Sequence, residues 1–145
     1  MRLLLFCLLL LTALTGCGRC DGGENPPDDP SPTVLSVTPR NNASTGTTPM
    51  VSVRFSEPMQ RAFGAVIVTP GDITLRASDG SWSENDQVVS FGEIGPLETG
   101  KTYSMEVEET FRDKQNNTLE APSTSRFQVP EMIPPRVDST VPALG

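Results

Sequence analysis

Histidine is absent from this chain of 145 residues. Its absence removes the commonest general base and the commonest imidazole metal ligand. The sequence also lacks the G-x-S-x-G, P-loop, H-E-x-x-H and dinucleotide-binding motifs. Because nothing positive points to a reaction, we expect no enzyme, no catalytic residues and no cofactor.

Basic residues are few, with 11 Lys and Arg against 18 Asp and Glu, and the net charge is -7. The basic residues are scattered singly along the chain. Since binding to phosphates needs a basic patch, this composition argues against a nucleic-acid partner.

Cysteine is restricted to the first twenty residues, at Cys7, Cys17 and Cys20. No disulfide can therefore form within the rest of the chain, and its stability has to come from the burial of apolar side chains.

Long apolar runs are also lacking, except for Leu3 to Leu14 near the N-terminus. A membrane-spanning helix needs about 20 residues, so this shorter run is typical of a signal peptide. The sequence Leu14-Thr15-Gly16-Cys17 resembles the lipobox of bacterial lipoproteins. The resemblance implies that residues 1–16 are a lipoprotein signal peptide and that Cys17 is lipidated, which would attach the protein to a membrane. Gly18 stands where an Asp commonly signals inner-membrane retention, so the outer membrane is favoured; an ordinary secretory signal is the alternative.

Residues 17–32 are rich in Pro, Gly and acidic residues and contain no aliphatic or aromatic side chain. Such a segment cannot bury apolar surface, so we expect a disordered, extended tether.

Residues 33–129 have the pattern of an all-β domain. Short apolar or alternating segments are separated by turn signals such as Pro70-Gly71 and Asp79-Gly80, while Asn41 to Pro49 has the composition of a loop. About seven strands are predicted: Val34 to Val37, Val51 to Phe55, Val66 to Thr69, Ile73 to Arg76, Val88 to Phe91, Tyr103 to Val107 and Phe127 to Val129. This number of short strands is typical of an Ig-like antiparallel β-sandwich.

The segment from Leu97 to Val107 combines a turn with a strand. Gly100 allows a sharp turn, Leu97 can close the end of a core, and Tyr103 falls on the inward face of the strand. This arrangement is typical of the tyrosine corner of Ig-like domains, in which the tyrosine hydroxyl bonds to the backbone of the preceding turn. We assign these three residues a structural role.

Five motifs in order resemble the bacterial Ig-like domain first described in S-layer proteins of the SbsA type. They are P-T-V-L-S-V-T-P, V-R-F-S-E-P-M, I-T-L, L-E-T-G-K-T-Y and F-R-D-K-Q-N-N-T-L, and they cover Pro32 to Val129. Thr99 and Asn116 depart from the family, which usually has Pro and Gly there. The resemblance implies a structural or adhesive module of envelope proteins, usually repeated in tandem and without catalysis.

The C-terminal segment, residues 130–145, partly repeats the start of the domain. The segment from Pro135 to Pro142 has Pro, Val, Ser and Pro at the same relative positions as the segment from Pro32 to Pro39, at an offset of 103 residues. We therefore expect a linker followed by the start of a second, truncated repeat.

Asp113, Asn116 and Asn117 offer oxygen ligands in one loop, as a calcium site would require. Few carboxylates converge there, and a turn held by Asx hydrogen bonds explains the same residues, so we predict no metal site.

Two functions remain open. The first is a non-catalytic, lipid-anchored protein of the bacterial cell envelope, whose domain is a structural spacer or an adhesive module for an envelope protein or polysaccharide. The second is a small ligand-binding or calcium-binding surface lipoprotein.

Overall fold

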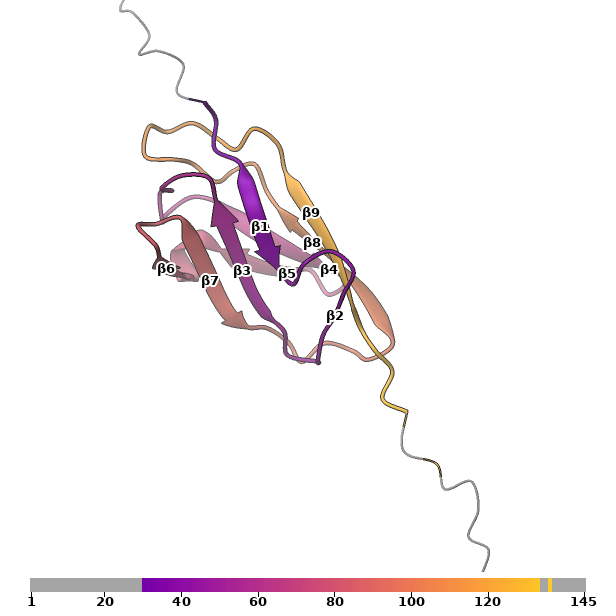
Figure 1. The fold of residues 1–145 in the computed structure, drawn as a ribbon. Helices are drawn as coiled ribbons and strands as arrows, with labels where there is room; N and C mark the ends of the chain where they lie inside the picture. Colours follow the sequence, from indigo (N-terminus) through magenta and orange to yellow (C-terminus); the bar gives the residue numbers. More distant parts are fainter. Residues whose placement is uncertain (1–29, 134–135, 137–145) are drawn as a thin grey trace, which may run out of the picture.

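The computed structural model describes residues 30–133 and residue 136. They form two β-sheets packed face to face (Figure 1). The first sheet has the order β1 (Val34–Thr38), β3 (Met50–Phe55), β7 (Val88–Glu93) and β6 (Ser81–Ser83). The second has the order β2 (Ala43–Ser44), β9 (Ser123–Val129), β8 (Lys101–Val107), β4 (Ala65–Thr69) and β5 (Ile73–Arg76). The predicted signal peptide, Cys17 and most of the predicted tether and second repeat lie outside the described residues.

The prediction of an all-β, Ig-like sandwich is confirmed, with nine strands in place of about seven. Strand pairs are antiparallel except for β2 and β9, which run parallel. The two additional strands, β2 and β6, have only two and three residues. The interpretation of Asn41 to Pro49 as a loop was therefore wrong at Ala43 and Ser44, because a pair of residues is too short to show alternation.

The core lies between the sheets and is built from alternating side chains. In β3, Val51, Val53 and Phe55 are buried, and in β8 the same holds for Tyr103, Met105 and Val107. On either side of β8 in the second sheet, β4 and β9 contribute Val66, Val68, Phe127 and Val129. The period of two thus places one face of each strand in the core.

The loops also fill one end of the core. The ring of Phe111 lies 4.9 Å from that of Phe55, centroid to centroid. The ring of Trp82, in the edge strand β6, is stacked at 6.2 Å from Phe55, and its Nε1–H donates to the carbonyl of Ala77 at 2.9 Å. Ala77 opens the short 3-10 helix Ala77–Asp79, which connects β5 in one sheet to β6 in the other. Trp82 therefore covers the rim of the core.

The chain enters and leaves the domain at opposite ends (Figure 1). Near the entry, Pro32 is buried and its carbonyl accepts a hydrogen bond from the N–H of Glu120. At the exit, the carbonyl of Val129 accepts one from the N–H of Gly100, at the start of β8. Because β8 has seven residues, these two ends are about 20 Å apart along the strands.

Across residues 30–133 and 136, no helix has the length and apolar character needed to cross a membrane.

Candidate functional site

The side chain of Tyr103 joins the core to the turn that precedes its strand. Its ring is 4% exposed and is stacked at 5.6 Å from the ring of Phe127. Its hydroxyl accepts a hydrogen bond from the backbone N–H of Glu98 at 2.9 Å. A buried tyrosine whose hydroxyl holds the preceding turn is the geometry of a tyrosine corner.

Leu97 and Gly100 fix the same turn from its two sides. Leu97 is buried, and its N–H donates to the carbonyl of Thr47 at 2.7 Å. Gly100 has a φ of 73°, a conformation that glycine adopts without strain, and its N–H reaches Val129 in β9. The turn therefore holds together the loop before β3, the start of β8 and the end of β9, which is a structural role.

Asp113 is fully buried and both of its carboxylate oxygens are hydrogen bonded. Oδ1 accepts from the backbone N–H groups of Gln115 and Asn117, at 2.9 and 2.7 Å, and Oδ2 accepts from the Asn117 side-chain amide at 2.8 Å. The Asp113 carbonyl also accepts from Nε2 of Gln60 at 2.7 Å. The carboxylate thus replaces water as the partner of the loop's own N–H groups.

Of the three residues considered for calcium, Asp113 and Asn116 already use their side-chain oxygens as hydrogen-bond acceptors. Asn117 donates its amide to Asp113, while Oδ1 of Asn116 accepts from the guanidinium of Arg112 at 3.0 Å. The φ of Asn116 is 78°, in the left-handed region that Asn tolerates after Gly. Among the described residues, no group of three or more Asp, Glu, Cys or His side chains could hold a metal ion.

A charged cluster at the entry end was not found from the sequence. Asp86 pairs with Arg61 at 2.7 Å and with Lys114 at 2.8 Å, which connects three loops. Hydrogen bonds from Lys114 and Arg61 hold the pKa of Asp86 below its ordinary value of 3.8. Arg61 lies 25 positions before Asp86 and Lys114 lies 28 positions after it, so no local sequence pattern could have revealed the cluster.

The family model of the bacterial Ig-like domain matches residues 28–129. The chain therefore belongs to the bacterial Ig-like domain family. Among curated proteins, none matches the chain.

Solved structures include similar folds. The crystal structure of CopC from Methylosinus trichosporium OB3b has a TM-score of 0.55 and 11% sequence identity, over 72% of this chain and 99% of that one. Two structures of the bacterial S-layer protein SbsC, rSbsC(31-844) and the N-terminal part, both have TM-scores of 0.44, with 20% and 21% identity. Each match covers 73% of this chain, but only 14% and 25% of the SbsC chains. At these identities, the likeness to CopC shows the fold alone.

Proposed function

We propose that the chain is a lipid-anchored, non-catalytic protein of the bacterial cell envelope, whose Ig-like domain is a structural spacer or an adhesive module. The observation that carries the proposal is the position of the two ends. The segment that follows Cys17 enters the domain at one end, and the chain leaves at the other (Figure 1). A membrane anchor at Cys17 would therefore hold the exit end away from the membrane surface.

Two further observations support this proposal. Membership of the bacterial Ig-like family favours a location at the cell surface or in the envelope. The buried polar side chains also serve the fold, since the Tyr103 hydroxyl and both Asp113 oxygens bond to backbone or side-chain groups of their own turns. Across residues 30–133 and 136, every buried side-chain nitrogen and oxygen atom has a hydrogen-bond partner, which suits a spacer.

The anchor is tested by comparing Cys17→Ser with a matched control, Cys20→Ser. Cys20 lies three residues further on, outside the lipobox. Lipidated proteins stay bound to membranes because each buried methylene contributes about 0.8 kcal/mol. In cell fractions, Cys17→Ser should move to the soluble fraction, whereas Cys20→Ser should stay with the outer membrane. Equal membrane retention of both variants would overturn the lipid anchor.

The two roles of the domain are separated by a binding experiment. Residues 28–129, immobilised without the anchor, are exposed to envelope extracts and to purified envelope polysaccharide. Saturable retention of one protein or of the polysaccharide supports an adhesive module. Without such retention, the domain is a spacer.

A further inference from the structure

The outer edge of β1 has no strand beside it within the described part of the chain. β1 is the terminal strand of its sheet and pairs only with β3, from Val34 opposite Phe55 to Thr38 opposite Ser52. A strand at an edge presents unpaired N–H and C=O groups, to which an extended segment can add.

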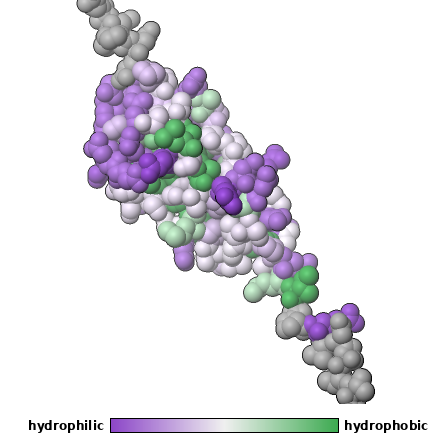
Figure 2. All heavy atoms as spheres, in the orientation of Figure 1, coloured by the Kyte–Doolittle hydropathy of each residue, from purple (hydrophilic) through white to green (hydrophobic). Residues whose placement is uncertain are grey.

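An apolar groove of about 600 Å³ runs beside this edge, between β1, β2 and the loop that leads into β3. Arg40 is the one charged residue among those that line it, which are Ser36, Val37, Thr38, Pro39, Arg40, Ala43, Thr45, Pro49 and Met50. Met50 is 57% exposed. Figure 2 also shows an apolar patch over β1, the strand in which Leu35 is 61% exposed. The edge therefore combines free backbone groups with apolar surface.

The chain contains a segment whose sequence fits such an edge. Pro135 to Pro142 repeats the frame from which β1 itself is built, with Val137 and Ser139 in the places of Val34 and Ser36. In an extended conformation, Val137, Ser139 and Val141 would share one face. Proline at either end would limit the added strand to residues 136–141, because proline cannot donate to a ladder.

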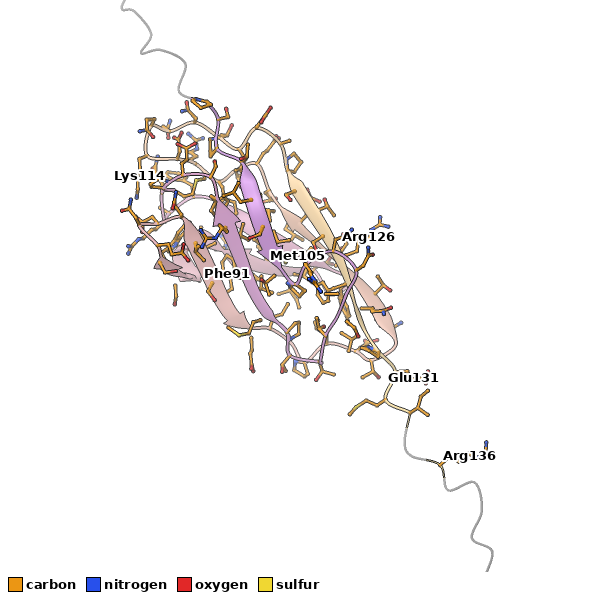
Figure 3. The ribbon with its side chains drawn as sticks, viewed as in Figure 1. Phe91, Met105, Lys114, Arg126, Glu131 and Arg136 are labelled. Carbon is orange, nitrogen blue, oxygen red and sulfur yellow. The ribbon has the colours of Figure 1, made fainter. Side chains whose placement is uncertain are left out.

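The direction of the chain favours an acceptor in another molecule. Residues 130–133 are exposed, with Met132 at 80% and Ile133 at 82%. Figure 3 shows Glu131 beyond the end of β9 and Arg136 still further from the domain. Residues 130–133 and Arg136 thus lead away from the domain that precedes them.

We propose that residues 136–141 of one copy add as a strand to the β1 edge of a second copy. Val137 and Val141 would lie on the face turned toward the apolar groove and fill it. Because the donated segment and the groove are different surfaces, the contact is heterologous and can repeat from copy to copy. The inference is independent of the lipid anchor, since both surfaces lie after Cys17.

Sedimentation of residues 28–145 and 28–133 tests the proposal. Both forms contain every described strand and the whole core, and both lack the cysteines. As the concentration rises through the micromolar to millimolar range, the sedimentation coefficient of residues 28–145 should increase. That of residues 28–133 should stay at the monomer value, and an added peptide of residues 134–145 should shift the amide resonances of β1.

Variants locate the contact on both surfaces. In the segment, Val137→Asp with Val141→Asp should abolish the increase, whereas Thr140→Ser, on the opposite face, should preserve it. In the groove, Met50→Glu should abolish the increase in sedimentation coefficient. The matched control is Phe63→Glu, which also replaces an exposed apolar residue, at 44% exposure, but outside the groove. Thermal melts of each variant at low concentration verify that the domain is folded.

Three outcomes would overturn the proposal. The first is that the protein of residues 28–145 stays monomeric over the whole concentration range. The second is self-association that persists in residues 28–133, which would assign it to the exposed apolar residues of the domain alone. The third is protection of the β1 amides that depends on the segment but not on concentration, which would show that the segment folds back on its own copy.

Discussion

Gly64 lies directly against the aromatic ring of Phe111. A Cβ atom on Gly64 would be 2.3 Å from Cγ of the ring, which is too close for any real contact. Gly64 also has a φ of 108°, a conformation that other residues rarely adopt. Phe111 is fully buried and packs on Phe55, so the ring cannot move aside without disturbing the core.

Gly64→Ala should lower the free energy of unfolding by at least about 2 kcal/mol, through strain in the backbone and overpacking in the core. Gly46→Ala is the matched control, because a Cβ there would meet no atom within 4 Å. Its effect should stay within about 0.5 kcal/mol. Urea unfolding of both variants measures the difference, and equal effects would contradict the close packing of Gly64.

Tyr103→Phe should lower the free energy of unfolding by about 1 to 3 kcal/mol, because the Glu98 N–H loses its partner. The aromatic ring and its contact with Phe127 are retained in this variant. Thr102→Val removes a hydroxyl from an exposed position on the same strand and serves as the control. A denaturant midpoint that is unchanged in Tyr103→Phe would count against the tyrosine corner.

Asp113→Ala should cost about 3 kcal/mol or more, because several donors lose a charged acceptor in a buried place. Asn116→Gly is the control in the same loop. The φ of 78° at Asn116 suits glycine, so the change should stay within about 1 kcal/mol. Thermal unfolding of both variants measures these effects, and a neutral Asp113→Ala would show that the loop's bonds contribute little.

Calcium should leave the melting temperature of the domain unchanged, since the Asp113 oxygens are already used by the loop. Melting curves with millimolar calcium and with chelator make the comparison. A ligand that binds only the folded state raises the melting temperature by mass action. An increase that is lost in Asp113→Ala would support the calcium-binding alternative.

The cluster around Asp86 should stabilise the fold at neutral pH and lose this effect in acid. Its pKa is lowered in the folded state by Lys114 and Arg61, so the contribution is complete above the ordinary value of 3.8 and declines as pH falls toward the lowered pKa. The difference in unfolding midpoint between wild type and Asp86→Asn should therefore shrink below about pH 4. High salt should reduce it as well, and a difference that does not change with pH would contradict this role.

The sequence predicted the fold well where one strand face is buried along its length. Tyr103, Met105 and Val107 alternate with polar residues, and the structure buries all three. The same reasoning missed the strands β2 and β6, because they are too short for their periodicity to be visible. Short edge strands are defined by their partners rather than by their own residues.

In the candidate site, too, the sequence predicted the contacts between nearby residues but not those between distant ones. The turn around Asp113 was visible from the sequence because its bonds join residues two and four positions apart. The partners of Asp86 lie in two other loops, and only the folded chain brings Arg61 and Lys114 together. Likewise, the apolar groove beside β1 is lined by Met50 of the same sheet and by Ala43 of β2 in the other sheet, so only the folded chain forms it.

The parallel pairing of β2 with β9 determines how the domain responds to tension. Ala43 lies opposite Phe127 and Ser44 opposite Gln128, while the N–H groups of Asn42 and Thr45 donate to carbonyls of β9 at 2.6 and 2.9 Å. Because β2 and β9 run parallel, we expect a force that pulls the entry and the exit apart to load this pairing in shear, so that its hydrogen bonds bear the load together. The two ends of the domain are thus joined by a shear-loaded mechanical clamp.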